Sequence, residues 1–533
     1  MNRRQFLAAG GLTLLGCSRK TDAPIPPGDL LGPNLDAGHH WRDGKGFPTP
    51  TETRRTHTLI VGGGMAGLSC GWWLQRAGTQ DFAVLELETE PGGNARSGRN
   101  TVSAYPWGAH YLPLPGMQAP ELRTMLAEFG ALKGNAATEK PEYEDRYVCF
   151  APQERLHING AWQEGLLPHF GVGGAERTQQ QRFITAIQSY KSQRDANGLP
   201  PFNIPRMRAG NEDRSLDSLS MRDWLLQQGM TAPTLHWFVN YCCRDDYGTD
   251  YSQVSAWAGI HYHASRHGLA ANADSDGVLT WPEGNAWLTQ RLAASVAQQL
   301  QTGAMAWRIA EEQGGAVADV FLLKEGRSVR YKADKLIWAG PTAFLPHAWA
   351  EAPSALRDAA ARMDHAPWLV ANLTLREYPA ETRHLALCWD NVTYGTPGLG
   401  YVVATHQRLD TQRHDTVFTY YRPLSEYAPA AARKLLLATP REVWAKQILA
   451  ELGAVHPDLA ELTSRIDVWR WGHAMARPTV GMLGGHLDVL RQPHGRVMLA
   501  HADLTGFSLA EEAHYWGVRA ARWAMDDPHW KEA

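Results

Sequence analysis

The chain has 533 residues, enough for roughly two to four domains and a large core. It carries 52 Lys and Arg against 55 Asp and Glu, and 44% of its residues are hydrophobic. This balance is typical of a soluble globular protein, and it argues against nucleic acid as a partner because that binding needs a basic surface. Tryptophan is abundant, with 21 residues. Since aromatic side chains line ligand pockets, we expect a cavity for a small molecule.

The N-terminus has the pattern of an export signal. Arg3 and Arg4 precede a short apolar run, residues 8–16, and together they resemble a signal for the twin-arginine export machinery. Cys17 ends a Leu-Leu-Gly-Cys sequence that resembles a lipobox, and lipidation there would attach the protein to a membrane surface. Residues 1–17 therefore predict a periplasmic, membrane-anchored lipoprotein. A cytosolic protein with a chance basic start, and a chance cysteine at this place, are the alternatives.

The next segment, residues 18–55, is rich in Pro and Gly and shows little apolar periodicity. This composition predicts an extended linker. The cysteines beyond Cys17 show no Cys-x-x-Cys spacing, so neither a disulfide framework nor a metal site is predicted from them.

The first strong motif follows a short strand pattern at residues 56–61. It reads Gly-x-Gly-x-x-Gly and leads into a helical pattern over residues 68–78, which is the context that a dinucleotide-binding fingerprint requires. Gly62 permits a tight turn, Gly64 lets the backbone approach a pyrophosphate, and Gly67 lets helix and strand pack closely. The alternative is a glycine-rich turn in another α/β fold.

Two further features fit a dinucleotide. Phosphates would lie at the positive N-terminus of the helix, beside the backbone of Met65 and Ala66. A second strand pattern, residues 82–86, ends in Glu86, 19 residues after Gly67. A carboxylate at this place can accept hydrogen bonds from both ribose hydroxyls.

The segment after Glu86 carries a family resemblance. A Gly-Gly pair at residues 92–93 and a Gly-Ala-His sequence at residues 108–110 follow the fingerprint. In this order the sequence resembles the flavin amine oxidase superfamily, which includes monoamine and polyamine oxidases, protoporphyrinogen oxidase and phytoene-desaturase-like enzymes. The resemblance covers roughly residues 56–533 and implies FAD as the cofactor. No cysteine or histidine stands where a flavin linkage would be assigned, so we expect non-covalent binding.

The same resemblance implies cofactor contacts along the chain. Asn94 stands where an arginine is common in the family, which leaves Arg96 as the cation of this loop. The last strand and helix would close over the flavin, where a helix N-terminus stabilises negative charge on the reduced ring. The implied contacts are Gly92, Gly93 and Arg96 at the diphosphate and flavin edge, Gly108, Ala109 and His110 beside the isoalloxazine, Ala306 at the adenine, Asp503 on the ribityl–phosphate side, and Ala510 and Glu511 at the last helix.

The predicted fold class is α/β, with a Rossmann-type FAD-binding domain interleaved with an α+β substrate domain. The FAD-binding domain is expected in residues 56–117, 281–345 and 479–533. The substrate domain is expected in residues 118–280 and 346–478.

Candidate catalytic residues lie near the end of the second substrate segment. Trp471 and His473 resemble residues at the active-site wall in the family, and His473 has a suitable intrinsic pKa for acid/base work. The alternative is that both only pack the two domains together. Asp245 and Asp246 could bind a cationic amine, or could simply end a helix that is held by Arg244.

One pair of histidines suggests a metal site. His261 and His263 would share one face of a strand, but without a cysteine or carboxylate partner at ligand spacing we predict no metal.

Two departures from the family bear on the reaction. The predicted strand at residues 368–375 lacks the lysine that amine oxidases often place near the flavin, and Leu509 replaces an aromatic residue. These departures favour a dehydrogenase that uses a quinone or protein electron acceptor over a fast oxidase. The predicted reaction is hydride transfer from a C–N or C–C bond of a small organic substrate, an amine among the candidates. The alternatives are a flavin-dependent isomerase, a desaturase-like enzyme, and a catalytically silent flavoprotein scaffold.

Overall fold

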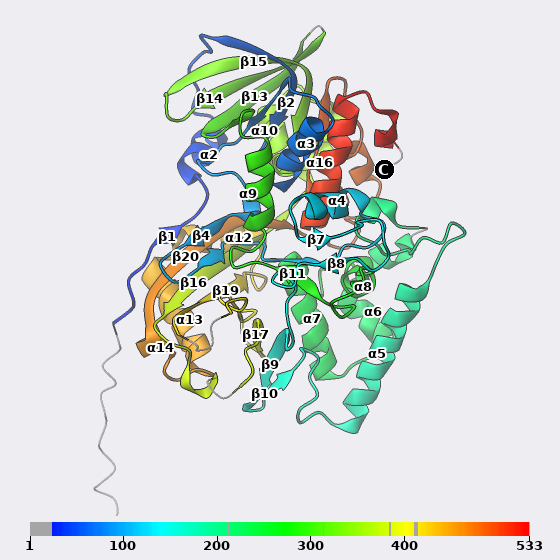
Figure 1. The fold of residues 1–533 in the computed structure, drawn as a ribbon, viewed down its shortest axis with the longest axis vertical. Helices are drawn as coiled ribbons and strands as arrows, with labels where there is room; N and C mark the ends of the chain where they lie inside the picture. The colour runs from blue at the N-terminus through cyan, green and yellow to red at the C-terminus, as the bar shows by residue number, and fades with distance from the viewer. Residues whose placement is uncertain (1–23, 211–212, 313, 383–384, 410–413, 532–533) are drawn as a thin grey trace, which may run out of the picture.

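The computed structural model describes residues 24–210, 213–312, 314–382, 385–409 and 414–531. Two large sheets, three two-stranded sheets and a group of helices make up this part of the chain, and segments distant in sequence alternate between the large sheets (Figure 1). The α/β prediction is confirmed. The predicted signal and lipobox at residues 1–17 lie outside the described residues.

The first sheet has the parallel core of a dinucleotide-binding fold. Seven strands have the order β12-β3-β2-β15-β14-β13, and β21 pairs with β15. The pairs β12–β3, β3–β2, β2–β15 and β15–β21 are parallel, whereas β13 and β14 form an antiparallel extension. The bounds are β2 (Thr53–Val61), β3 (Phe82–Leu85), β12 (Leu300–Gln301), β13 (Ala304–Glu312), β14 (Gly315–Leu322), β15 (Arg327–Trp338) and β21 (Val497–Leu499).

Three helices pack beside this sheet: α3 (Met65–Arg76), α9 (Ala286–Ser295) and α16 (Ala510–Ala524). Helices α3 and α16 lie side by side (Figure 1). Gly517 of α16 allows this close approach, because a Cβ there would lie 2.2 Å from the carbonyl oxygen of Ala66. The final helix is thereby fixed against the helix that opens the glycine fingerprint.

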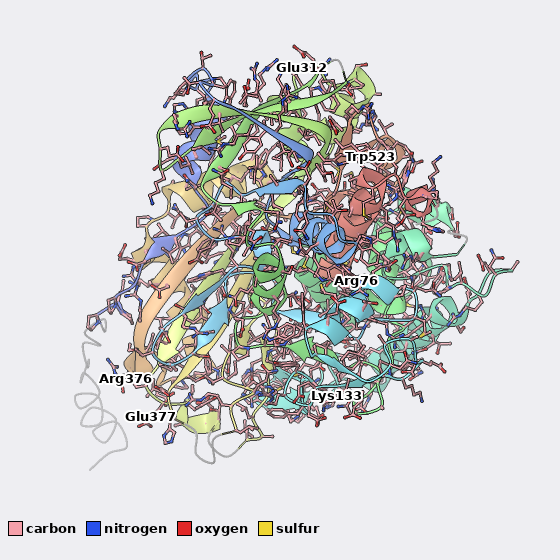
Figure 2. The ribbon with its side chains drawn as sticks, turned by 45° about the horizontal axis from the view of Figure 1, so that its top comes forward. Arg76, Lys133, Glu312, Arg376, Glu377 and Trp523 are labelled. Atoms are coloured by element: carbon pink, nitrogen blue, oxygen red, sulfur yellow. The ribbon has the colours of Figure 1, made fainter. Side chains whose placement is uncertain are left out.

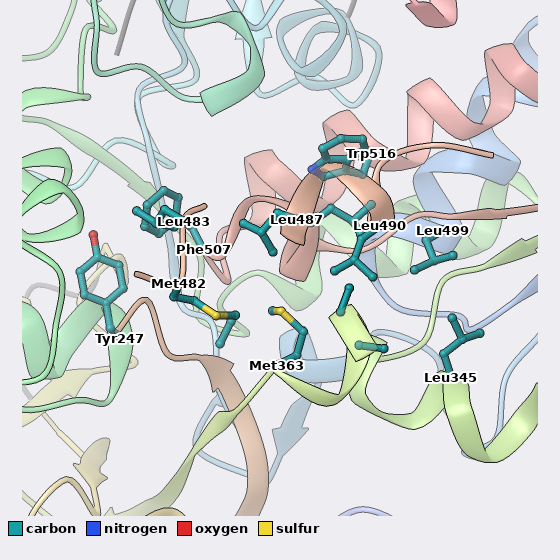
Figure 3. Close-up of a cluster of buried hydrophobic side chains, with 14 of the residues drawn as sticks. Tyr247, Leu345, Met363, Met482, Leu483, Leu487, Leu490, Leu499, Phe507 and Trp516 are labelled. Carbon is teal, nitrogen blue, oxygen red and sulfur yellow. The ribbon is translucent and has the colours of Figure 1, made fainter. Parts of the chain in front are cut away.

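Figure 3 shows how apolar side chains fix the end of this domain. Leu499 of β21 and Trp516 of α16 lie in one buried cluster with Leu487 and Leu490 of α15 (His486–Leu490). Leu345, at the start of α10 (Leu345–Ala348), joins the same cluster. Because this apolar surface is removed from water, the cluster stabilises the chain segment that connects β21 to α16.

The second sheet has eight strands in the order β1-β20-β16-β19-β18-β17-β9-β10. Strand β16 (His365–Leu375) is buried along its whole length. Leu369 and Leu373 lie in one buried cluster with side chains of the helices beside the sheet, while Trp368 and Val370 lie in another cluster on the opposite face, which is the period-two alternation of a strand. The bounds are β1 (Leu30–Leu31), β9 (Glu154–Ile158), β10 (Ala161–Glu164), β16 (His365–Leu375), β17 (Asp390–Thr393), β18 (Tyr401–Val403), β19 (Thr416–Pro423) and β20 (Thr463–Ala476), with α12 (Pro429–Ala438), α13 (Arg441–Gly453) and α14 (Leu459–Leu462) beside it.

A helical group completes the substrate side: α5 (Gly174–Ser192), α6 (Met221–Gln227), α7 (Pro233–Tyr247) and α8 (Ala256–Ala264). His261 and His263 lie on helix α8, so the predicted strand is wrong. The apolar run that precedes them has no clear period, and such a short run does not distinguish strand from helix. His261 is buried, and its Nε2 lies 3.0 Å from the carbonyl oxygen of Asn203. Among the described residues, no three His, Cys, Asp or Glu side chains gather as they would around a metal ion.

Shorter elements connect these layers, and charged side chains such as Glu312 and Arg376 project from the periphery (Figure 2). No helix in the described part of the chain is both long and apolar enough to cross a bilayer. The connecting elements are β4 (Ser97–Arg99), β5 (Ala104–Pro106), β6 (Tyr111–Pro113), α4 (Pro120–Glu128), β7 (Leu132–Lys133), β8 (Glu142–Tyr143), β11 (Val278–Thr280) and α11 (Ser354–Ala361).

The segment predicted as a linker is ordered and bridges the two sheets, so that prediction is wrong for residues 24–55. Strand β1 pairs in parallel with β20, and helix α2 (Leu35–Arg42) follows it. The backbone N–H of Asn34 donates to Glu88 Oε1 at 2.8 Å, and Trp41 Nε1 donates to the carbonyl oxygen of Trp307 at 3.0 Å. The sequence pattern did not predict these elements, because a strand of two residues and a helix of eight leave little periodicity to detect.

Replacing Trp41 by alanine tests whether this segment stabilises the fold. The change removes its indole hydrogen bond to β13 and part of the buried surface of the segment, so we expect the free energy of unfolding to fall by about 2 kcal/mol. Urea denaturation followed by tryptophan fluorescence measures the loss. Arg42→Ala on the same helix is the control, because the side chain of Arg42 is 57% exposed. Equal stability of the Trp41 variant and the wild type would contradict a bridging role.

Candidate functional site

The glycine fingerprint forms the tight turn between β2 and α3. Gly62 has φ +116°, and a Cβ there would lie 2.7 Å from the carbonyl carbon of Ala339. A Cβ on Gly67 would lie 1.8 Å from the carbonyl oxygen of Gly62. Only glycine fits at these two positions, as the sequence pattern predicts.

The N-terminus of α3 opens onto a surface made of backbone. Gly64 is the N-cap, and no side chain caps the helix. A Cβ on Gly64 would meet only the Cα of Gly93, at 3.8 Å, and Gly93 itself has φ +56°. The first N–H groups of the helix, at Met65 and Ala66, therefore have no side-chain cap, and the Gly-Gly loop passes next to them. Uncapped N–H groups and the helix dipole both favour an anion such as a pyrophosphate at this helix end.

Glu86 lies at the end of β3, where a ribose-binding acid is expected. Its Oε2 accepts a hydrogen bond from the N–H of Gly63, and its Oε1 accepts one from the N–H of Glu88, both at 2.8 Å. Burial raises the pKa of Glu86, while these two N–H groups act to lower it. The N–H of Ala304 donates to the carbonyl oxygen of Glu86 at 2.8 Å, which brings the start of β13, and with it Ala306, to the same edge of the sheet.

Arg96 is held in place beside the Gly-Gly loop. Its Nη1 lies 3.1 Å from Glu88 Oε2, and its Nε donates to the carbonyl oxygen of Gly93 at 3.3 Å. Its guanidinium lies 4.9 Å from the ring centroid of Trp469 and 5.6 Å from that of Trp471. The loop thus carries a fixed positive charge next to Gly93, although Arg96 is already paired with the carboxylate of Glu88.

The Gly-Ala-His segment is locked against the Gly-Gly loop and the second sheet. The N–H of Ala109 donates to the carbonyl oxygen of Asn94 at 3.1 Å, and the hydroxyl of Tyr421 donates to the carbonyl oxygen of Gly108 at 3.0 Å. A Cβ on Gly108 would lie 2.2 Å from that same oxygen of Asn94, so this position also requires glycine.

A cavity of ≈ 130 Å³ lies between the two domains. The predicted residues Gly108, Ala109, His110, Trp471, Ala510 and Glu511 all line it. Trp471 is fixed there by a 2.6 Å hydrogen bond from its Nε1 to the carbonyl oxygen of Trp107. The cavity therefore joins residues that the family resemblance assigned from both ends of the chain.

His110 is part of the aromatic wall of this cavity. Its ring stacks on Tyr421 with centroids 4.4 Å apart, and its Nδ1 lies 3.3 Å from the carbonyl oxygen of Gly108. Burial lowers the pKa of His110 to about 4. At neutral pH the imidazole is uncharged, so it serves as packing and as a hydrogen-bonding group.

His473 does not line the cavity. Strand β20 contains a bulge: Trp471 pairs with Trp368 and Met475 pairs with Ala366, so three residues of β20 stand opposite Pro367 alone. The bulge breaks the alternation that would have placed His473 on the same face as Trp471. The side chain of His473 is exposed and lies against Phe344, with ring centroids 5.2 Å apart. The prediction that it faces the cavity is wrong.

Asp503 lies away from the cavity as well, in a cluster with two histidines. Its Oδ1 lies 3.1 Å from His365 Nε2, its Oδ2 accepts from the N–H of Thr342 at 2.9 Å, and His501 Nδ1 lies 3.2 Å from Oδ2. Burial opposes ionisation, but the two histidines hold the pKa of Asp503 well below its usual range. Both oxygens already have protein partners, so Asp503 fits a role in fixing β21 and β16 better than cofactor contact.

Acidic groups and one cation gather at the end of the cavity that α7 and α8 form. Asp245 and Asp246 of α7 line it, and so does Arg266, which follows α8. Arg244, predicted to hold the helix end, instead donates to Ser425 at 3.0 Å. Arg266 lies in no motif and reaches the site only through tertiary packing, so sequence reasoning missed it.

No lysine lines the cavity within the part of the chain that the structure describes. The predicted position of the family lysine falls on β16, at Ala371 and Asn372. Asn372 is buried and fully engaged, since its Nδ2 donates to the carbonyl oxygen of Pro106 at 3.1 Å and its Oδ1 accepts from Thr419 at 2.7 Å.

Comparisons with known proteins agree with this arrangement. Residues 60–129 match the family described as an NAD(P)-binding Rossmann-like domain. An L-amino acid oxidase of Lachesis muta is 26% identical over 177 residues, which cover 33% of this chain and 32% of that protein. An L-amino-acid oxidase of Daboia russelii is 25% identical over the same length. The match thus spans about a third of these relatives.

Nearly the whole chain resembles solved structures in its fold. A putrescine oxidase bound to putrescine superposes with a TM-score of 0.67 at 17% identity, covering 89% of this chain and all of the other. Cyclohexylamine oxidase from Brevibacterium oxydans gives 0.63 at 16% identity, with 89% and 99% covered. A fatty acid isomerase from P. acnes gives 0.62 at 16% identity, with 88% and 98% covered. The fold is therefore one that amine oxidases and an isomerase share.

Proposed function

We propose that the protein is an FAD-dependent oxidoreductase of the amine oxidase type, acting on a C–N or C–C bond of a small organic substrate. The cavity carries the proposal: it extends from the Gly-Ala-His segment, next to the glycine fingerprint, to the acidic pair on α7. A substrate held there would lie between a dinucleotide-binding edge and groups that recognise charge. The similarity to amine oxidases supports the same assignment.

FAD fits the residues present. The uncapped N-terminus of α3, beside the side-chain-free Gly64 and Gly93, suits its diphosphate, and the oxygens of Glu86 lie where an adenosine ribose would. When bound, FAD supplies a site that accepts a hydride from the substrate carbon. The expectation of non-covalent binding is kept as part of the proposal.

The chain's own side chains would hold the substrate and exclude water. Trp368, Trp471 and Tyr421 supply an apolar wall that orients a carbon skeleton, and the acidic pair holds its polar end. His110 is uncharged at neutral pH, so the titratable groups at hand are Asp245, Asp246 and Glu511. Burial raises the pKa of Glu511 to about 7, which leaves it able to accept or release a proton at neutral pH.

Anaerobic mixing with candidate substrates tests the proposal. We expect the visible flavin absorbance of the purified holoprotein to bleach with at least one compound from a panel of polyamines, amino acids and polyenes. The second candidate, a non-oxidative flavin isomerase, is favoured by the fatty acid isomerase neighbour. It predicts a rearranged product without net bleaching. If the panel gives neither bleaching nor a rearranged product, the scaffold alternative is favoured.

For location we propose export by the twin-arginine route and a lipid anchor at Cys17. Both rest on the sequence of residues 1–17. A membrane-tethered enzyme would have ready access to a quinone or to a protein acceptor.

A further inference from the structure

We propose that Asp245 and Asp246 form a proton-exchanging cation site: the empty pair shares one proton, and an ammonium group that enters the cavity displaces it. The inference rests on the proposed function, because the ammonium is taken to be that of the substrate. The proposal states that the substrate binds as a cation and that its ammonium proton later passes to the aspartate pair.

The geometry brings both carboxyl groups to one end of the cavity. They occupy the last turn of α7, which ends where Gly248 takes a left-handed conformation with φ +58°. Asp246 is 7% exposed and lies 3.5 Å from the hydroxyl of Tyr111 and 3.9 Å from Arg266. Within the described residues, no hydrogen bond or ion pair reaches the carboxyl group of Asp245. Among the described residues, therefore, only the carboxyl group of Asp246 has a hydrogen-bond or ion-pair partner.

Two other buried polar atoms in the same cavity also lack partners. Ser265 Oγ and Asn285 Oδ1 make no hydrogen bond among the described residues, and each side chain belongs to a residue that is 3% exposed. Buried polar groups are nearly always satisfied, so a ligand is the natural partner. Asn285 uses its Nδ2 to donate to the carbonyl oxygen of Tyr111, and its free oxygen can only accept. The missing partner must then be a donor, as an ammonium group is.

The surrounding charges explain why the empty pair keeps a proton. Burial and the neighbouring carboxyl group raise the pKa of Asp245 to about 7. Burial raises that of Asp246 to about 6, while Arg266 and Tyr111 act to lower it. Two like charges in one dry site cannot both ionise without a counter-charge. Four titratable groups on α7 itself act on the pair: Tyr241, Cys242, Cys243 and Tyr247. The groups that act on it from other segments are Tyr111, Glu154, Tyr262, Arg266, Asp390, Tyr421 and Glu511, and Arg266 is the one cation among them.

The exchange balances in protons and charge. When R–NH₃⁺ binds, the shared proton leaves to solvent, and two carboxylates then face one ammonium. Before a carbon–nitrogen bond can be oxidised, the ammonium must become a neutral amine, and an N–H proton then passes to Asp245. The pair thus gives up one proton on binding and takes one back before the redox step.

Calorimetric titration of the holoprotein with tert-butylammonium tests this exchange, because that probe has no α C–H and cannot be oxidised. We expect a binding heat that depends on the ionisation enthalpy of the buffer, which reports proton release. Affinity should rise between about pH 5 and pH 8, since the competing proton is lost over that range. Neutral tert-butanol should release no proton. Buffer-independent binding of the ammonium would overturn the proposal.

Variants give a second readout. Asp245→Asn should weaken tert-butylammonium binding at least tenfold and remove the buffer dependence. Asp274→Asn, which removes an exposed carboxylate outside the cavity, should leave both unchanged. Unchanged binding by the Asp245 variant would contradict the proposal. The titration needs no turnover, so it separates this inference from the proposed function. Proton-linked ammonium binding without any bleaching substrate would reject only the proposed function. Bleaching by a substrate without proton release on ammonium binding would reject only this inference.

Discussion

Replacing Gly64 by alanine is expected to abolish cofactor retention without unfolding the protein. The new Cβ would meet only the Cα of Gly93, at 3.8 Å, so the turn itself can accept it. The methyl group would occupy the space that a pyrophosphate needs at the N-terminus of α3. Losing about two charge-assisted hydrogen bonds at 1.5–3 kcal/mol each predicts FAD affinity at least about 100-fold weaker.

Equilibrium dialysis against FAD measures this affinity, and circular dichroism checks the fold. Gly173→Ala is a matched control, because Gly173 is also a helix N-cap, with φ −73° and no atom within 4 Å of a built Cβ. Gly67→Ala should behave differently and destabilise the whole protein, since its Cβ would lie 1.8 Å from a carbonyl oxygen. Wild-type FAD affinity in the Gly64 variant would contradict the assigned phosphate site.

Reoxidation of the reduced protein by oxygen is expected to be slow, by a factor of about 100 or more relative to an efficient oxidase. Negative charge develops on oxygen in that reaction, and a positioned cation typically contributes several kcal/mol to such a step. The residues of β16 nearest the predicted lysine position are Ala371 and Asn372, and the amide of Asn372 is fully bonded. The nearby cation, Arg266, is committed to Asp246 and Tyr111.

Rapid mixing of anaerobically reduced protein with aerated buffer measures this rate. A parallel experiment with a soluble quinone should show faster reoxidation. A rate with oxygen that matches an efficient oxidase would contradict the prediction and would assign the charge stabilisation to Arg266.

Local signals made the dinucleotide edge predictable. The strand, the three glycines and Glu86 lie within a short stretch of sequence, and the clash that restricts Gly67 is with the carbonyl oxygen of Gly62 in the same turn. The last strand and helix could be recognised for a similar reason, because β21 and α16 follow each other closely.

The features that sequence patterns did not predict depend on packing between segments that are distant in the chain. Residues 24–55 gain their order from pairing with β20, which is more than 400 residues away. His473 turns outward because of a bulge that depends on the partner strand β16, and no pattern in its own strand marks it. Arg266 meets the acidic pair only because α7 and α8 pack together. Such contacts depend on tertiary neighbours, whereas motifs record only local requirements.

The central claim is that the glycine fingerprint and its neighbours bind FAD without a covalent bond. Acid precipitation of the native, full-length protein, followed by chromatography of the supernatant, tests this most directly. The account predicts close to one FAD released per chain and a colourless pellet. A pellet that stays yellow, or a supernatant that contains a nicotinamide dinucleotide and no flavin, would contradict it.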